Sequence, residues 1–541
     1  MKSNNKKLII ILSIAIAIFS ISVIDKTFQN DTFFNISIGK HILENGIDMK
    51  EPFCWVQDNL DYSYSHWAFD IIMYLIFSKF SFTGIYIFTI IFTAIIGITL
   101  FLVLNKRSKY TIIPFAVTLL TLHIMPYAFT ARSQIISFLC FIVEIFCIEQ
   151  FIETKQKRYG LLLILQAIII ANFHAATWPL ILVLFLPYVA SGLLNIVTFK
   201  NIRKYNIKKL EKKINSLPKD SPKINEYQEQ IEIHTKIINE PQNEFANYKI
   251  VARPDYYLKG LIILMLLVTL TGLLTPIHGT PYTYIIKSMF GPSNFEDSIS
   301  IDYVNEMQPL IPLTNIGFIV FVIILLSFLL FLPTKLKREH GFLILGLLIM
   351  ALSSRRYCFL LVLLGSFVLV DLITQTFKLL IPEDLNALEK LFTKKLTACC
   401  LLFFIIIHSV STFLDFYPRP YVDENMYPVA AVEYIKKHLD YKNIKIFNSY
   451  NNGSYLMLND IPVFIDSRLD VYCSEFNDTD IFYDYIQSIY GNQHYEDTFS
   501  KYDFTHILIE SENVINKYIC KDPNYVLLHS DDAYCLYERT L

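Results

Sequence analysis

Long apolar runs recur along this chain and restrict what it can fold into. After Lys2, Lys6 and Lys7, the first run extends from Leu8 to Ile24, and no small-residue cleavage site follows it. Ten more runs follow, at 83–104, 111–126, 134–153, 159–172, 178–199, 257–275, 314–333, 341–353, 356–376 and 396–414. A membrane-spanning helix needs roughly 20 apolar residues, which the shorter runs approach with their flanks. We therefore predict an α-helical polytopic membrane protein with about eleven transmembrane helices.

The composition excludes several other classes of protein. Of 541 residues, 53% are hydrophobic and 18% are charged, which is too apolar for a soluble chain of several domains. The net charge of −2 provides no global field that would attract nucleic acid. The nine cysteines form no CxxC pair and no Cys/His cluster, which argues against a zinc or iron–sulfur site. Membrane lipid is therefore the first partner that the sequence predicts.

Positive charge predicts the orientation of the chain in a plasma membrane. If the N-terminus is cytoplasmic, the connections on that side are rich in Lys and Arg. They are 105–110, 154–158, 200–256, 334–340 and 377–395. This pattern requires Trp67–Phe80 to be a re-entrant or surface-lying helix, because every later loop would invert if it crossed. An odd number of spans places the C-terminal region outside the cytoplasm.

Two segments are too polar to lie in lipid. Residues 200–256 are expected to form a cytoplasmic helical hairpin or a partly disordered loop. From about Tyr421 onward, a helical pattern at Val429–Leu439 precedes short strand-like runs, with helical stretches between several of them. The runs are Lys445–Asn448, Pro462–Asp466, Thr505–Glu510, Tyr525–His529 and Ala533–Tyr537. We predict a transmembrane domain at 1–420 and a small extracytoplasmic α/β domain at 421–541.

Within residues 1–420, the outer loops are expected at 25–82 and 276–313. Cys520 and Cys535 flank two strand-like runs in the C-terminal domain, so they could form a disulfide or remain free thiols.

The predicted topology places many polar residues on the outer side. They are Asp31, His66, Arg132, Gln134, Asn172, His174, His278, Glu306, Arg355 and Arg356. Ionisable groups at membrane depth are costly and usually face a cavity, so a group of this size indicates a pocket.

Each of these residues also has a simpler interpretation. Asp31 could be the N-cap of the amphipathic segment Thr32–Leu43. Asn172 and His174 could cap a span and bond a neighbouring helix, and the two arginines at 355 and 356 could extend to lipid headgroups. His278 could be an ordinary loop residue, and Glu306 a solvated one.

The order of several short motifs resembles a bacterial multi-pass family related to the GT-C glycosyltransferases, from about Asp31 to Glu538. The first stretch reads Asp31-Thr-Phe-Phe-Asn-Ile-Ser-Ile-Gly39, followed by His41-Ile-Leu-Glu-Asn-Gly46, Pro52-Phe-Cys-Trp55 and His66-Trp67. Arg132-Ser-Gln134, Ala171-Asn-Phe-His174, Pro276-Ile-His-Gly279, Asn305-Glu306 and Arg355-Arg356 follow in order. Phe447-Asn-Ser-Tyr-Asn-Asn-Gly-Ser-Tyr-Leu456 and Val463-Phe-Ile-Asp-Ser-Arg468 complete the likeness.

The sequence departs from the family pattern at Ile170, Ala175, Ser133 and Met307, where relatives carry Trp, Gly, Pro and an aromatic residue. These departures leave the predicted fold in place and put catalytic competence in question.

The resemblance implies transfer of a sugar from a polyprenyl-phosphate donor to an acceptor on the outer face. Asp31 would act as base or metal ligand, and Arg355 and Arg356 would bind the departing phosphate. Arg132 and His278 would support the phosphate, while Glu306 and His174 would orient the acceptor or help to hold a divalent cation. No cofactor is required by the sequence, and the acceptor is not specified. Two alternatives stay open: a non-catalytic scaffold or accessory subunit, and a transporter of lipid-linked sugars.

Overall fold

The computed structural model describes residues 2–540 with several gaps. The gaps are 58, 109, 199, 219–220, 240–249, 252–255, 291–303, 305, 312–314, 393, 478, 480 and 492–493. Asn305 of the predicted Asn305-Glu306 motif and part of the predicted outer loop 276–313 therefore lie outside the described residues.

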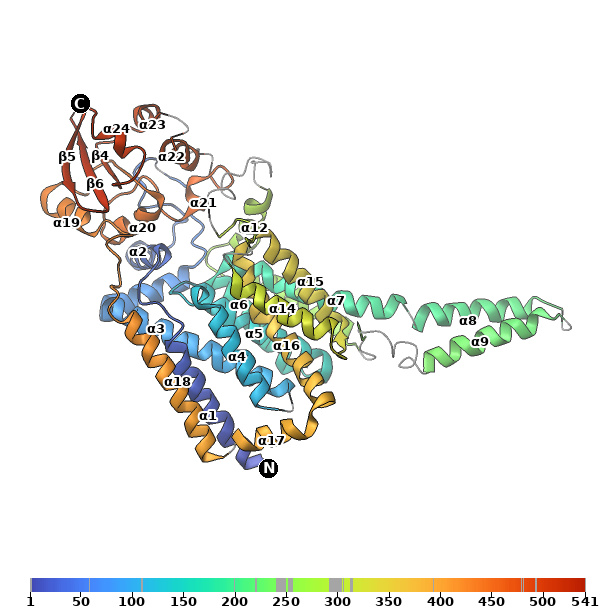
Figure 1. The fold of residues 1–541 in the computed structure, drawn as a ribbon. Coiled ribbons are helices and arrows are strands. Elements are labelled where there is room, and N and C mark those ends of the chain that lie inside the picture. The colour runs from blue at the N-terminus through green and yellow to red at the C-terminus, as the bar shows by residue number, and fades with distance from the viewer. Residues whose placement is uncertain are drawn as a thin grey trace.

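The described chain is mostly helical, and most of its helices pack into one bundle (Figure 1). The bundle contains α1 (Lys2–Ile21), α3 (Trp67–Arg107), α4 (Ile112–Ile124), α5 (Gln134–Thr154), α6 (Lys157–Phe173), α7 (Trp178–Thr198), α11 (Leu258–Leu270), α14 (Ile316–Leu330), α15 (Arg338–Ser353), α16 (Cys358–Leu380), α17 (Pro382–Phe392) and α18 (Lys395–Phe416). Each of the eleven apolar runs predicted from the sequence coincides with one of these helices or with part of one. Helix formation within these runs is therefore confirmed.

Among the described residues, five helices are long and apolar enough to cross a membrane. They are Trp67–Arg107, Gln134–Thr154, Ala175–Leu194, Arg355–Leu380 and Leu396–Phe416. Three more apolar helices are shorter, at Ile112–Ile124, Leu258–Leu273 and Ile316–Leu330. The helical content is compatible with a membrane protein, and a crossing for each of the eleven runs stays a prediction.

The long helix α3 is broken near its middle. Ser81 has φ 53° and ψ −158°, which are not helical values, so 67–80 and 82–107 are two helical segments joined at one residue. The N-terminal segment packs against α2 (Asn30–Asn45), where a Cβ at Gly39 would meet the backbone of Asp70. The sequence predicted a separate helix at 67–80, and the break at Ser81 separates it from the apolar run that follows.

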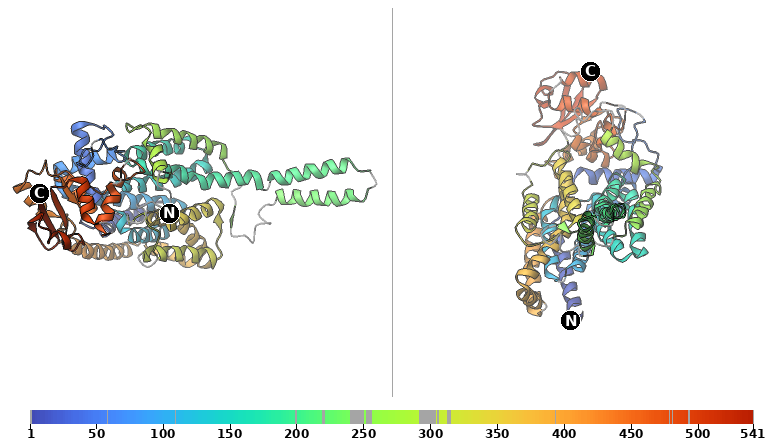
Figure 2. Two further views of the ribbon diagram at one scale, coloured as in Figure 1. Left: turned by 90° about the horizontal axis from the view of Figure 1, so that it is seen from above. Right: turned by 90° about the vertical axis from the view of Figure 1, so that its right-hand side faces the viewer.

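The polar segment after α7 forms a helical hairpin. Helices α8 (Lys200–Asn215) and α9 (Lys223–Asn239) lie antiparallel and project away from the bundle in both Figure 1 and Figure 2. Beyond the hairpin, β1 (Ile250–Val251) pairs in parallel with β2 (Leu336–Lys337), directly before α15. Of the two structures expected for 200–256, the described part adopts the hairpin.

The C-terminal region is a small α/β domain at one end of the bundle (Figure 1). Its strands β3 (Ile446–Asn448), β4 (His506–Glu510), β5 (Tyr525–Ser530) and β6 (Tyr534–Arg539) form one sheet in the order β3-β4-β6-β5, in which only β3 and β4 are parallel. Its helices are α19 (Val429–His438), α20 (Tyr450–Leu458), α21 (Leu469–Tyr472), α22 (Ile481–Ile489), α23 (Tyr495–Tyr502) and α24 (Asn516–Ile519). Four of the five predicted strands and the predicted first helix are confirmed.

The fifth predicted strand, Pro462–Asp466, is wrong as a sheet strand. Val463 forms an isolated parallel bridge with Cys54, and its backbone nitrogen donates to Phe53 O at 3.0 Å. Its consecutive apolar residues, Val463 to Ile465, are buried, and Phe464 packs against both Trp55 of the loop that follows α2 and Phe447 of β3. Buried residues of this loop, Leu60, Tyr62 and Tyr64, share one hydrophobic core with the C-terminal domain.

A buried ionic group also joins this loop to the C-terminal domain. The Arg468 guanidinium contacts both oxygens of Glu51, at 2.5 and 2.9 Å, and both oxygens of Asp466, at 2.8 and 2.6 Å. All nine cysteines are free thiols in the structure, so Cys520 and Cys535 are not paired.

Candidate functional site

Several of the predicted site residues meet between the bundle and the C-terminal domain, although distant parts of the chain supply them. Asp31 comes from the first turn of α2, and Arg132 from the turn before α5. Glu306 comes from the loop between α12 (Thr280–Phe290) and α14, and Arg356 from the short helix η5 (Arg355–Tyr357). The segment that carries Asp31 is held against this site by Thr32, whose hydroxyl donates to Ala131 O at 3.3 Å.

Arg132 joins the two carboxylates of this cluster. Its Nη2 lies 2.5 Å from Asp31 Oδ2, and its Nη1 donates to Glu306 Oε1 at 2.6 Å. The side chains of Asp31 and Arg132 are 24% and 20% exposed, and that of Glu306 is 50% exposed. Solvent therefore reaches all three groups.

Asp31 is not the N-cap of α2. The helix begins at Asn30 with Gln29 in the cap position, and the carboxylate of Asp31 pairs with Arg132 instead of the backbone. The simpler interpretation of Asp31 is therefore wrong, because its carboxylate makes a tertiary contact with a residue about a hundred positions away.

The surroundings of the two carboxylates shift their pKa values in opposite directions from the ordinary values. Burial raises the pKa of Asp31; Arg132 opposes this effect and Glu306 adds to it. Burial also acts to raise the pKa of Glu306, but Arg132 and, more weakly, Arg356 hold it below its usual range. Burial thus favours the protonated form of Asp31, whereas the neighbouring guanidinium groups favour the ionised form of Glu306. Burial acts to lower the pKa of Arg132, but its two acidic partners hold it above the usual range, which keeps the guanidinium charged.

The neighbouring arginines 355 and 356 have different roles. Arg355 donates from Nε to Pro309 O at 3.1 Å and from Nη2 to Gln308 Oε1 at 3.0 Å, so it secures the loop that carries Glu306. Among the described residues of that loop, Arg356 hydrogen-bonds only Glu306, through its backbone nitrogen, which donates to Glu306 O at 3.2 Å. Its side chain is exposed and makes no hydrogen bond or ion pair with any described residue. The Arg356 guanidinium is therefore open to an anionic ligand beside the cluster.

Two histidines form the neutral part of the site. The rings of His66 and His174 have centroids 5.0 Å apart, and His174 Nδ1 lies 2.8 Å from the hydroxyl of Ser137. Burial lowers the pKa of His66 to about 3 and that of His174 well below its usual value, and Arg132 and Arg356 act in the same direction on both. Both rings are uncharged at neutral pH and can exchange hydrogen bonds with a hydroxyl or phosphate.

Other predicted residues serve the local structure. Asn172 Nδ2 donates to Ile168 O and Leu274 O, at 2.8 and 3.0 Å, as its simpler interpretation predicted. Gln134 Nε2 donates to Ala128 O at 2.9 Å. His278 is exposed with φ 53°, and within the described residues no contact joins it to the cluster.

The divalent cation that the resemblance allows stays an expectation. Where the chain is described, no three His, Cys, Asp or Glu side chains are close enough to hold a metal ion. The two carboxylates that would supply charged ligands share Arg132 instead.

A second polar cluster lies at the opposite end of the bundle. Arg107 pairs with Glu149, and its Nη2 donates to Asp371 Oδ2 at 2.6 Å. His340 Nε2 lies 2.7 Å from Glu149 Oε1, and the hydroxyl of Tyr188 donates to the same oxygen at 3.2 Å. Helices α3, α5 and α15 each have one end near the first cluster and the other end here. The sequence showed Arg107 only as a loop charge and Glu149 only as a charge within an apolar run.

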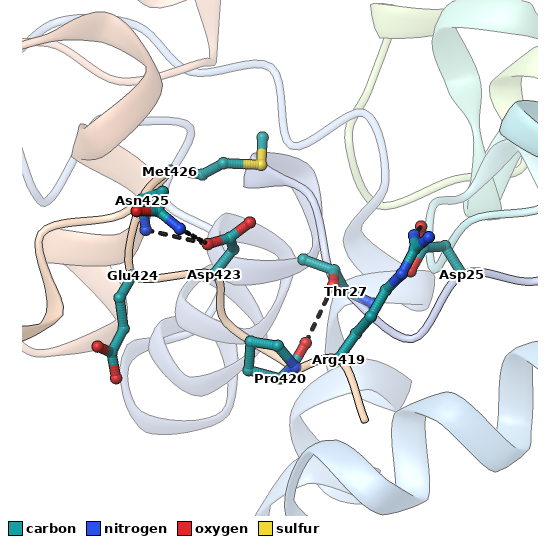
Figure 3. A pocket seen from close by; sticks show the side chains of 8 residues that line it. All are labelled: Asp25, Thr27, Arg419, Pro420, Asp423, Glu424, Asn425 and Met426. Carbon is teal, nitrogen blue, oxygen red and sulfur yellow. Dashed lines mark hydrogen bonds and ion pairs between the residues drawn. The ribbon is translucent and has the colours of Figure 1, made fainter. Parts of the chain in front are cut away.

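A hollow of about 540 Å³ lies where the chain passes from α18 to the C-terminal domain (Figure 3). It is lined by Asp25, Thr27, Arg419, Pro420, Asp423, Glu424, Asn425 and Met426. Two of its carboxylates are already engaged, since Asp25 pairs with Arg419 at 2.5 Å and Asp423 Oδ1 accepts from the backbone and side chain of Asn425. This hollow is separate from the cluster around Arg132.

The chain matches no known protein-family model, and no curated protein sequence is significantly similar to it.

Proposed function

We propose that this protein is a membrane glycosyltransferase of the GT-C type, which transfers a sugar from a polyprenyl-phosphate donor to an acceptor hydroxyl on the extracytoplasmic face. The observation that carries the proposal is that a solvent-accessible carboxylate, Asp31, lies near a guanidinium, Arg356, that binds no described residue, between the apolar bundle and the C-terminal domain. The first can accept a proton and the second can meet a phosphate, which are the two needs of this reaction.

The proposed step is a single displacement at the anomeric carbon. The acceptor oxygen attacks this carbon, the bond between the carbon and the phosphate oxygen breaks, and the bonding electrons leave with the phosphate. Asp31 takes the hydroxyl proton on Oδ1, since Oδ2 is held by Arg132. The configuration at the anomeric carbon inverts because attack and departure occur on opposite faces.

Arg356 is proposed to neutralise the charge that develops on the departing phosphate. Fixed cationic groups directed at such charge commonly supply a large share of the rate acceleration. Arg132 stays between Asp31 and Glu306, so in this scheme it orients the base and contributes little to phosphate binding. His66 and His174, both neutral, are placed to hydrogen-bond sugar or acceptor hydroxyls.

Radiolabelled polyprenyl-phosphate sugars incubated with membranes that contain the protein test this proposal. Asp31→Asn keeps the shape and a hydrogen bond to Arg132 but removes the base, so transfer should fall by roughly 10²–10⁴. Asp25→Asn is the matched control, because Asp25 lies shortly before α2 but pairs with Arg419 away from the cluster. Full activity in Asp31→Asn would refute the assignment of the base.

The two alternatives make different predictions in the same assay. A scaffold or accessory subunit would transfer no sugar in the wild type, with any donor. A transporter would move the labelled lipid across vesicles without forming a product.

A further inference from the structure

The side chain of Asn30, next to the proposed base, is held by two residues of the C-terminal region. The hydroxyl of Tyr427 donates to Asn30 Oδ1 at 2.6 Å, and Asn30 Nδ2 donates to Asn451 Oδ1 at 3.1 Å. The amide of Asn30 thus donates to one partner and accepts from the other, which fixes its orientation. Both partners lie about 400 residues further along the chain.

The first turn of α2 has no capping side chain of its own. Gln29 occupies the cap position without a side-chain hydrogen bond to the helix, and the carboxylate of Asp31 is directed at Arg132. The ends of helices fray unless their free backbone groups are bound, and capping typically contributes about 1 kcal/mol. Because the first turn of α2 lacks such a cap, tertiary contacts are needed to hold the side chain of Asp31 in place.

Residues 417–428, here termed the strap, supply such contacts along the segment before α2. Lys26 Nζ donates to Tyr417 O at 2.8 Å, the hydroxyl of Thr27 to Pro420 O at 3.0 Å, and the Phe28 nitrogen to Tyr421 O at 2.9 Å. The contact between Thr27 and Pro420 is visible in Figure 3, at the edge of the hollow. The strap therefore contacts three consecutive residues, Lys26 to Phe28, of the segment that leads into α2.

The contact around Tyr427 combines packing with hydrogen bonding. Its ring is buried and meets Phe33 edge to face, with centroids 4.9 Å apart. Tyr455 of α20 packs against the same phenylalanine at 5.5 Å, but its hydroxyl is not among the described partners of Asn30. Tyr427 and Tyr455 thus share a packing role, and Tyr427 alone adds the bond to Asn30.

We infer that the C-terminal domain contributes to the proposed catalytic site. Its residues Tyr427 and Asn451 hold Asn30 by hydrogen bonds and thereby position Asp31. This inference rests on the proposed function. Tyr427 and Asn451 are positioning residues, since both bind Asn30 and neither is proposed to touch the reacting atoms. The bundle supplies Arg132 on one side of α2, and the C-terminal domain fixes the turn from the other.

Tyr427→Phe tests the inference, because it removes one hydroxyl and keeps the buried ring. We expect kcat for sugar transfer to fall about tenfold while KM for the donor stays unchanged, since small misplacement of a reacting group lowers the rate of the chemical step. Asn451→Ala, which removes the second partner, should give the same split. Tyr455→Phe is the matched control and should behave as the wild type.

Hydrogen exchange of a peptide covering residues 25–36 provides a measurement independent of activity. In Tyr427→Phe this peptide should exchange faster than in the wild type and in Tyr455→Phe, with the rest of the chain unchanged. Unchanged exchange, or faster exchange with wild-type kcat, would overturn the inference and leave the proposed function standing. If the wild type transfers no sugar, the proposed function fails, and the exchange measurement still decides whether Tyr427 holds the first turn of α2.

Discussion

Arg355 and Arg356 show how adjacent residues of one type take different tasks. The Arg355 guanidinium donates hydrogen bonds to Gln308 and Pro309, whereas the side chain of Arg356 is exposed. Arg355 therefore cannot replace Arg356 without releasing the loop that carries Glu306. This division follows from the short helix η5, which points consecutive side chains in different directions.

Arg356→Gln should raise the donor KM and lower kcat of the proposed transfer, because a cation is lost from both the bound and the departing phosphate. Arg355→Gln should lower thermal stability, since it removes bonds that anchor a loop. The measurement is steady-state transfer kinetics together with thermal unfolding in detergent. Equal kinetic effects of the two substitutions would contradict the separate roles.

The acid limb of the pH–activity profile should report the pKa of Asp31. A base must be unprotonated to act, so activity rises with pH through its pKa. Arg132 lowers the pKa of Asp31, in opposition to burial and to Glu306. Arg132→Gln removes that effect and should move the acid limb to higher pH, whereas Arg132→Lys keeps the charge and should move it less. A shift to lower pH would exclude Asp31 as the titrating base.

At the scale of helices, the cluster around Arg107 secures the end of the bundle away from the C-terminal domain. Arg107, Glu149 and Asp371 come from α3, α5 and α16, and their side chains are 8%, 6% and 18% exposed. Removing one member of such a buried group leaves uncompensated charge, which typically costs about 3–5 kcal/mol. The group therefore acts as an ionic clamp between three helices.

Arg107→Met should consequently lower the free energy of unfolding by an amount of this order, about 3–5 kcal/mol, because two carboxylates lose their shared partner. Lys106→Met is the control, since Lys106 is exposed and its Nζ lies 4.8 Å from the centroid of the Phe146 ring, with no ion pair to any described residue. Denaturant unfolding in detergent, followed by tryptophan fluorescence, measures both variants. Equal stability of the two variants would show that the clamp is not a stabilising element.

The helices could be predicted because the length and the composition of each apolar run indicate a helix without any information from the rest of the chain. A boundary between 67–80 and the run from 83 was also predicted, but the backbone conformation that makes it, φ 53° at Ser81, has no sequence signature. The ion pairs were equally hidden: Arg107 and Asp371 are 264 residues apart, and Arg468 and Glu51 are 417 apart. Alternation of the helices placed Asp31, Arg132 and Glu306 on one side, but only folding shows that Arg132 joins the other two.

For the whole molecule, the two polar clusters lie at opposite ends of the helices they share. Arg107 and Lys337, near one end, belong to connections that the charge rule places in the cytoplasm, and Asp31 and Glu306 lie at the other. The loop after α2 and the C-terminal domain share one core, so both must be on the same side of any membrane.

This arrangement makes the topology testable with single cysteines in a background without native cysteines. Ser108 is half-buried against Thr374, so exposed positions are better probes: Lys157, Lys236 of the hairpin, and Ser500 of the C-terminal domain. If the bundle crosses the membrane an odd number of times, an impermeant thiol reagent should label 500 on intact cells. Positions 157 and 236 should react only after permeabilisation.

If residues 67–80 form an additional crossing, the whole pattern inverts after α3, with 157 and 236 labelled from outside and 500 protected. Because Asp31 and the loop after α2 precede residues 67–80, that result would place them on the opposite side from Arg132 and the C-terminal domain, against their contacts in the structure, and would remove the proposed extracytoplasmic transfer.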